Sequence, residues 1–195
     1  SFEEFKKIVN QFPNLRWIGL TGIGESFLNK DFMKMLRYVK SKSITVELYD
    51  NFYFLNDSMI KDLIDLKIDR IYISIDGATK KTYEKIRVGS NFDRVLENIR
   101  KLFEYRKASG RNIPRIDFHY IVSKINVHEL TKFIELVDSF GSKNSEILFT
   151  RVLHGFKEIE KLFVEIPKKV INDTEKKAKE FGIRIYWGGD VPKIK

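Results

Sequence analysis

The chain has 195 residues, of which 43% are hydrophobic, and it contains no cysteine. This length and composition suit one domain with a substantial core, and they exclude a disulfide scaffold and any thiolate-held metal within these residues. The formal net charge of +9 permits contact with nucleic acid, but lysines alternate with acids along helices such as 97–107, which is typical of a solvated surface and argues against a nucleic-acid partner.

The sequence contains no stretch that is long and apolar enough to cross a bilayer and no signal-peptide pattern at its start. We therefore expect an intracellular, cytoplasmic protein that makes no contact with a membrane.

Alternating secondary structure is predicted along the chain. Ser1-Phe-Glu-Glu4 has the spacing of a capping box and predicts a helix at the start. Apolar, β-branched and aromatic runs predict strands at 15–20, 44–49, 70–75, 115–122, 146–150 and 183–187. Three-four spacing predicts helices at 32–39, 60–66, 92–108, after Asn126 with Gly141 as its C-cap, and at 168–181 before Gly182. The segment 151–167 fits either a loop or an inserted helix.

This alternation favours an α/β fold with a mainly parallel sheet, in which right-handed crossovers place the loops after the strands along one rim. We expect residues 1–195 to form a single domain. The chain opens with a helix, whereas a βα protein normally begins with a strand. The pattern therefore predicts that a first strand, and the loop that follows it, lie upstream of Ser1.

A glycine-rich segment follows the first predicted strand. In Thr21-Gly-Ile-Gly-Glu-Ser26, Gly22 and Gly24 allow a ligand to approach the backbone, and Glu25 supplies an anion that suits an ammonium group. The alternative is a tight strand-to-helix turn in which Glu25 lies near a helix N-terminus.

A second motif follows the strand at 70–75. Ser74 and Asp76 alternate with isoleucines and so share one face, and Arg87 comes one helical turn after Tyr83. A guanidinium can hold a carboxylate through two hydrogen bonds. The alternative is that Asp76 caps the next helix and Arg87 makes a structural ion pair.

These motifs together resemble the radical S-adenosylmethionine (radical SAM) superfamily. Thr21 to Asn29 looks like the family's Gly-Gly-Glu-Pro segment, and Ile71 to Arg87 is similar to the fourth strand and helix of its peptide-modifying and cofactor-maturing branch, which is often joined to SPASM domains. Val122 to Asn126 and His128 to Leu130 also resemble that branch. The resemblance covers residues 15–150, leaves 151–195 as a C-terminal extension, and implies a partial (β/α)6-type barrel that lacks its first strand.

The resemblance also implies roles for individual residues. The backbone around Gly22 and Gly24, with Glu25, would bind the methionyl amino group of S-adenosylmethionine. Ser74 would contact the methionyl or ribose part, and Arg87 would bind the carboxylate. Asp76 would contact the cofactor or fix the turn, and Asn51, which lies where the family often has Thr-Asn-Gly, would line the same cavity.

The sequence departs from the family in three places. Ser26 replaces the usual proline, and Asp50 and Phe52 alter the motif around Asn51. The third departure is the missing Cys-x-x-x-Cys-x-x-Cys loop, whose three thiolates hold a 4Fe–4S cluster in the family. We expect these ligands upstream of Ser1, so that this chain supplies no metal ligand, and we weigh this against a naturally cluster-free relative.

The resemblance thus predicts the S-adenosylmethionine-binding portion of an iron–sulfur enzyme that generates a 5′-deoxyadenosyl radical for hydrogen abstraction. Its expected partners are an electron donor and a peptide, cofactor or porphyrin-like substrate, and we expect this chain alone to be inactive. The alternative is a cluster-free barrel that acts as a ligand-binding or scaffold module.

Other candidate residues are less informative. The histidines His119, His128 and His154 are too dispersed to indicate a metal triad. His119 or Tyr120 could face a substrate cavity from the predicted strand. The run Trp187 to Asp190 fits either part of the binding rim or a plain turn.

Overall fold

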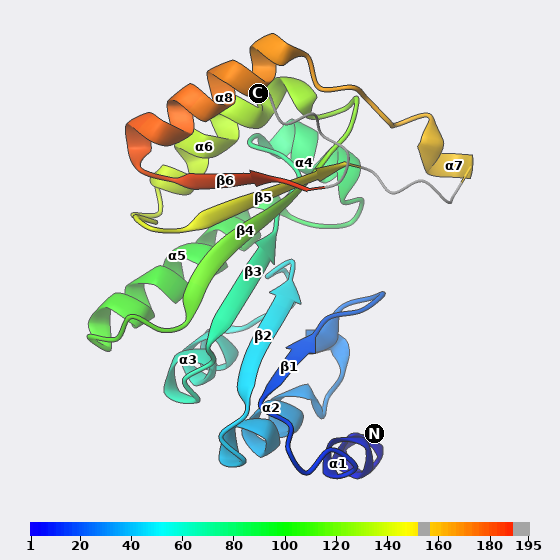
Figure 1. Ribbon diagram of the computed structural model, residues 1–195, viewed down its shortest axis with the longest axis vertical. Helices are drawn as coiled ribbons and strands as arrows, with labels where there is room; N and C mark the ends of the chain where they lie inside the picture. Colours follow the sequence, from blue (N-terminus) through cyan, green and yellow to red (C-terminus); the bar gives the residue numbers. More distant parts are fainter. Residues whose placement is uncertain (152–156, 189–195) are drawn as a thin grey trace. The chain divides into compact units, whose positions relative to one another are not determined.

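The computed structural model describes residues 1–151 and 157–188 (Figure 1). The chain divides into two compact units. Unit 1 comprises Ser1–Ile73 and Val95–Ile116, and unit 2 comprises Ser74–Arg94 and the residues from Asp117 onward.

Unit 1 contains the first three strands and the helices that follow them. Its elements are α1 (Phe2–Asn10), β1 (Trp17–Leu20), the short 3-10 helix η1 (Ser26–Leu28), α2 (Phe32–Ser41), β2 (Thr45–Asp50), α3 (Asp57–Asp65), β3 (Arg70–Ser74, whose last residue belongs to unit 2) and most of α5 (Phe92–Ala108). The capping box predicted at the start is present, because Ser1 and Glu4 bond reciprocally.

Unit 2 contains most of β4 and the two strands that follow it. Its elements are α4 (Lys80–Ile86), β4 (Arg115–Val122), the 3-10 helix η2 (Val127–Glu129), α6 (Leu130–Asp138), β5 (Glu146–Arg151), α7 (Lys157–Glu160), α8 (Lys168–Phe181) and β6 (Arg184–Trp187). Helices α6 and α8 lie side by side, as Figure 1 shows.

The strands form one six-stranded sheet in the order β1-β2-β3-β4-β5-β6. β1 pairs with β2, β2 with β3, β4 with β5 and β5 with β6, and all four pairings are parallel. Within unit 1, the backbone N–H of Arg115 donates to the carbonyl of Asp69, and within unit 2 that of Ile75 donates to the carbonyl of His119. A parallel sheet needs a crossover between successive strands, and the intervening helices supply it. The predicted α/β fold with a mainly parallel sheet is therefore confirmed.

Burial alternates along the strands and identifies the face that packs against helices. On β4, Phe118 and Tyr120 are fully buried, and both rings contact Phe133 of α6. His119, between them, therefore points to the opposite face of the strand. On β3, Ile71 and Ile73 are buried in the same alternating way.

The predicted bounds agree closely with the structure where the hydrophobic period is strong. The strand at 115–122 and the helices at 92–108 and 168–181 have the bounds that were predicted, and Gly182 caps α8 in a left-handed conformation. The C-cap predicted for α6 is wrong, because the helix ends at Asp138 with Ser139 as its C-cap residue, and Gly141 lies two residues after that cap in a left-handed conformation. Within the described part of the chain, none of the helices is both long and apolar enough to cross a membrane.

Candidate functional site

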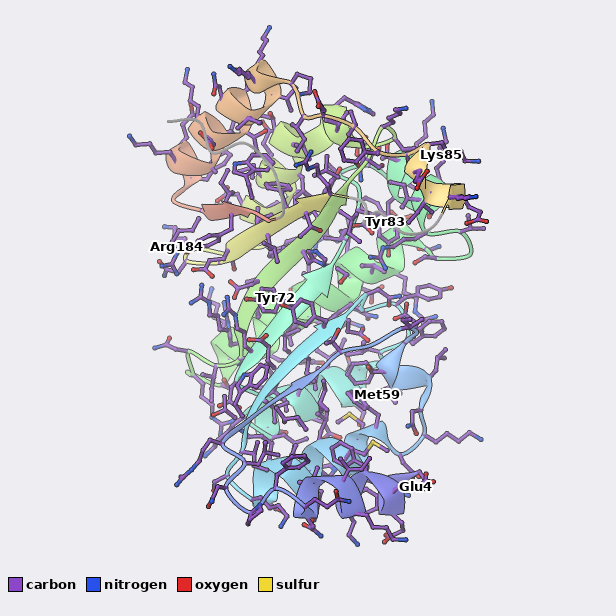
Figure 2. The ribbon with its side chains drawn as sticks, turned by 45° about the vertical axis from the view of Figure 1, so that its right-hand side comes forward. Glu4, Met59, Tyr72, Tyr83, Lys85 and Arg184 are labelled. Atoms are coloured by element: carbon purple, nitrogen blue, oxygen red, sulfur yellow. The ribbon has the colours of Figure 1, made fainter. Side chains whose placement is uncertain are left out.

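The turn between β3 and α4 is tightly packed. A Cβ atom added at Gly77 would lie 2.7 Å from the backbone nitrogen of Tyr83, so only glycine fits there. Tyr83, which is labelled in Figure 2, is fully buried and packs against Phe92. The backbone of the turn is thus pressed directly against the helix that follows it.

Asp76 and Arg87 form an ion pair at the two ends of this segment. Nε and Nη2 of Arg87 lie 2.8 and 2.7 Å from the same oxygen, Oδ2 of Asp76. The other carboxylate oxygen of Asp76 accepts the backbone N–H of Ile121 at 2.8 Å. The ion pair weighed from the sequence is therefore present. Asp76 does not cap α4, because Thr79 occupies that position and accepts the N–H of Thr82.

The pairing leaves one edge of the guanidinium available. Among the described residues, Nη1 of Arg87 has no hydrogen-bond partner, and the side chain is 21% exposed. Asp76, at 6% side-chain exposure, fixes the opposite edge. An arginine held in this way can donate from Nη1 and Nη2 to a ligand carboxylate, since it already has a fixed orientation. Ser74, the last residue of β3, is partly exposed, and Asp76 follows two residues after the strand.

The buried carboxylate of Glu129, to which sequence reasoning assigned no role, bonds to this turn. Oε2 of Glu129 accepts the N–H of Ala78 at 2.7 Å, and Oε1 accepts the hydroxyls of Thr79 and Thr82 at 2.6 and 2.7 Å. Burial alone raises the pKa of Glu129, but these three hydrogen bonds outweigh it and hold the pKa below the ordinary carboxyl value. Glu129 is therefore ionised at neutral pH.

Asn126 ties the same turn to the end of β4. Its Nδ2 donates to the carbonyl oxygens of Asp76 at 3.0 Å and Ile121 at 2.8 Å, and its Oδ1 accepts the N–H of Ser123. Asn126 is fully buried, and its backbone carbonyl accepts the Tyr120 hydroxyl at 3.1 Å. Sequence reasoning noted Asn126 and Glu129 only as part of a family resemblance, because their partners lie about 50 residues earlier in the chain.

From the sequence, we expect that either His119 or Tyr120 could face a substrate cavity. Of the two, His119 lies on the face of β4 opposite the one that packs against α6. Its Nε2 lies 2.8 Å from the hydroxyl of Thr150 on β5. Burial lowers the pKa of His119, the nearby Asp76 raises it and Arg87 lowers it, and the net pKa is below the ordinary value. His119 is therefore a neutral imidazole at pH 7. Tyr120 points to the helix-covered face instead.

The loop after β1, in unit 1, has open surroundings. A Cβ atom added at Gly22 or Gly24 would meet no described atom within 4 Å. Gly24 has a φ of +106°, a conformation that favours glycine, and Ile23 between the two is fully exposed. Glu25 is the N-cap residue of η1, although its side chain makes no capping hydrogen bond. This loop exposes backbone donors and acceptors beside a carboxylate.

Asn51 lies in a strained turn after β2. Asp50 Oδ1 accepts the N–H of Phe52 at 2.6 Å, and Asn51 Oδ1 accepts that of Tyr53 at 2.8 Å. Phe52 is buried and has a φ of +63°, which a residue with a side chain rarely adopts. The side-chain amide of Asn98, on α5, donates to the carbonyl of Phe52 at 2.8 Å and so stabilises this turn. Phe52 thus adopts a backbone conformation that glycine reaches without strain.

The described residues contain no group of three or more histidine, aspartate or glutamate side chains that could hold a metal ion. Of the run Trp187 to Asp190, only Trp187 and Gly188 lie within the described residues. The indole of Trp187 stacks on Phe149 and donates to Glu175. Trp187 is therefore held by the packing of β6 against its neighbours.

Comparison with known proteins identifies the family. The model of the radical SAM superfamily matches residues 1–137. The chain is 31% identical over 144 residues to the tungsten-containing aldehyde ferredoxin oxidoreductase cofactor-modifying protein of Pyrococcus furiosus, which covers 72% of this chain and 40% of that protein. It is 29% identical over 136 residues to a probable GTP 3′,8-cyclase of Saccharolobus islandicus, covering 69% of this chain and 41% of that one.

Solved structures show the same fold. SuiB of Streptococcus suis bound to S-adenosylmethionine matches 97% of this chain and 44% of its own with a TM-score of 0.75, at 10% sequence identity. SuiB has also been solved with its precursor peptide SuiA, with a TM-score of 0.74. The chain belongs to the radical SAM superfamily, which confirms the resemblance seen in its motifs. It spans about two fifths of the length of the curated relatives it matches.

Proposed function

We propose that this chain is the S-adenosylmethionine-binding portion of a radical SAM enzyme. The observation that carries the proposal is the fixed guanidinium of Arg87, which is aligned by Asp76 and keeps Nη1 without a partner among the described residues. Family membership supplies the chemistry of the ligand, whose methionyl end carries a carboxylate and an ammonium group.

In unit 2, Arg87 binds the methionyl carboxylate through the edge that Asp76 does not occupy. Asp76 fixes the plane of the guanidinium through two contacts to one carboxylate oxygen, so little side-chain entropy is lost when a ligand binds. Ser74, partly exposed at the end of β3, is placed to donate a hydroxyl hydrogen bond to the methionyl or ribose part.

In unit 1, the loop from Gly22 to Glu25 binds the methionyl ammonium group. The open space at Gly22 and Gly24 allows the backbone to approach a ligand, and Glu25 contributes the negative charge. Asn51 contributes an amide from the turn after β2, since its Oδ1 is used by Tyr53 and its Nδ2 is the remaining donor.

The iron–sulfur cluster does not fit the residues of this chain. All 195 residues are without cysteine, and the family's cluster is held by thiolates. In the intact family, the cluster and S-adenosylmethionine together would supply the radical chemistry, and no residue of this chain is assigned a part in it. This chain's own residues bind and orient the cofactor. The cluster ligands, the electron donor and the small-molecule or peptide substrate belong to the activity of the whole protein.

The absence of cysteine also favours a second candidate function. A member of the family without a cluster would act as an S-adenosylmethionine-binding or scaffold module. Iron analysis of the purified natural protein distinguishes the two functions. Iron together with S-adenosylmethionine cleavage under reducing conditions supports the enzyme, whereas binding of the cofactor without iron supports the module.

The proposed binding role is tested by titrating S-adenosylmethionine into the purified protein by calorimetry. Arg87→Met should weaken binding by a factor of about 10 or more, because a charge-assisted hydrogen bond contributes about 1.5–3 kcal/mol. Arg37→Met is the matched control, since Arg37 is an exposed arginine of α2 that pairs with Asp62. Equal affinities for the Arg87 variant and the wild type would contradict the proposal.

A further inference from the structure

The segment that connects β4 to α6 holds the turn carrying Asp76 more strongly than helix capping requires. Thr79 already caps α4, yet Glu129 adds three hydrogen bonds to the first residues of that helix and the preceding turn. Both carboxylate oxygens of Glu129 are used, whereas a neutral side-chain amide offers a single acceptor oxygen, and these bonds offset the cost of burying a carboxylate. The charged group therefore fixes the turn with unusual strength.

Two chains of hydrogen bonds connect the 123–129 segment to Arg87. The first runs from the Asn126 amide to the carbonyl of Asp76, and from the Asp76 carboxylate to Arg87. The second runs from Glu129 through Ala78, Thr79 and Thr82 into α4. Arg87 is the C-cap residue of that short helix, so fixing its start also fixes the position from which the guanidinium extends.

We propose that Asn126 and Glu129 are positioning residues that set the carboxylate-binding geometry of Arg87. The inference rests on the proposed function and deepens it, because it assigns both residues a role that acts through Asp76, α4 and Arg87. It follows that the affinity for the ligand carboxylate depends on the placement of the 123–129 connection. Since α6 begins at Leu130, directly after Glu129, a shift of that helix changes this affinity.

The test compares two ligands on the same purified protein, S-adenosylmethionine and decarboxylated S-adenosylmethionine. The second ligand lacks only the carboxylate that Arg87 is proposed to hold. Glu129→Gln preserves volume but removes the negative charge and one of the two acceptor oxygens, so its amide oxygen can accept from Ala78 or from the two threonine hydroxyls but not from both, and the positioning bonds are weakened. We expect it to weaken S-adenosylmethionine binding about tenfold and to leave the affinity for the decarboxylated ligand unchanged.

Three further variants keep the test independent of folding. Thr82→Val removes a single donor to Glu129 and should produce a smaller loss, again confined to the carboxylate-bearing ligand, whereas Thr82→Ser should behave like the wild type. Ser142→Ala is the control for general destabilisation, because Ser142 is fully buried in unit 2 and bonds the carbonyl of Val137. It should lower thermal stability without changing the ratio of the two affinities.

The outcomes separate the inference from the proposed function. A wild-type protein that binds neither ligand overturns both. A wild-type protein that prefers S-adenosylmethionine, and whose preference survives Glu129→Gln and Thr82→Val, overturns the inference alone. Equal weakening of both ligands by Glu129→Gln likewise contradicts it, because that result indicates a general structural role.

Discussion

The loop after β1 and the turn after β3 both carry proposed ligand-binding residues, but they are built in opposite ways. The loop in unit 1 is open around Gly22 and Gly24, and Ile23 is fully exposed. The turn in unit 2 is packed against α4 at Gly77 and hydrogen-bonded to a buried carboxylate, Glu129. The first segment leaves its backbone accessible, whereas the second is held in place by packing and hydrogen bonds.

This difference has a thermodynamic consequence. A segment that orders only on binding loses conformational entropy at that step, whereas a preformed segment has lost it during folding. An ammonium group is a compact charge that backbone acceptors can bind from several directions. A guanidinium must be held in one plane to bind a carboxylate through two hydrogen bonds. The fixed turn is therefore the one that carries Arg87.

Alanine substitutions at Gly77 and Gly22 should give the largest difference in stability between the two segments. Gly77→Ala places a Cβ atom 2.7 Å from the backbone of Tyr83, and we expect it to lower the free energy of unfolding by about 3 kcal/mol. Gly22→Ala meets no described atom and should stay within about 0.5 kcal/mol of the wild type. Urea unfolding measures both. Similar losses for the two variants would show that the packing contrast is wrong.

The turn after β2 sharpens the comparison, because it combines burial with backbone strain at Phe52. Phe52→Ala and Phe52→Gly remove the same ring contacts, but glycine relieves the φ of +63°. Phe52→Gly should therefore be more stable than Phe52→Ala by about 1 kcal/mol. Chemical denaturation of the pair tests this, and the opposite order would exclude strain at this position.

Acid should loosen the turn after β3. The folded-state pKa of Glu129 lies below its unfolded value, so its contribution to stability is complete above the unfolded pKa and is lost as the pH falls through the folded pKa. Replacing Glu129 with glutamine should remove this part of the pH dependence. Thermal melts of both proteins between pH 6 and pH 3 measure it, and parallel curves would contradict the assignment.

The smallest expected effect concerns His119. Because burial lowers its pKa, protonation favours the unfolded state, and stability should fall as the pH drops below the ordinary histidine value. Nuclear magnetic resonance titration of the ring carbon-bound hydrogens gives the pKa directly, with His119→Asn to assign the signal. Titration at or above pH 6.5 would show that the ring is less buried than the structure indicates.

Local sequence signals predicted the elements well where a single physical cause acts within a few residues. The alternation in 115–122 and the three-four period in 92–108 gave the bounds of β4 and α5, because burial of one face follows directly from strand and helix geometry. The choice of helix cap was harder. Asp76 and Thr79 both suit an N-cap, and the carboxylate of Asp76 is instead used by Arg87 and Ile121.

The sequence by itself determined the order of strands and helices, the parallel α/β class and the rim on which Ser74, Asp76 and Arg87 lie. Only the tertiary structure decided which donor meets which acceptor. Glu129 and Asn126 bond partners about 50 residues earlier in the chain, and no local period or propensity encodes such a separation. Those contacts form because packing α6 against β4 brings the connection between them to the turn after β3, where buried polar groups must find partners.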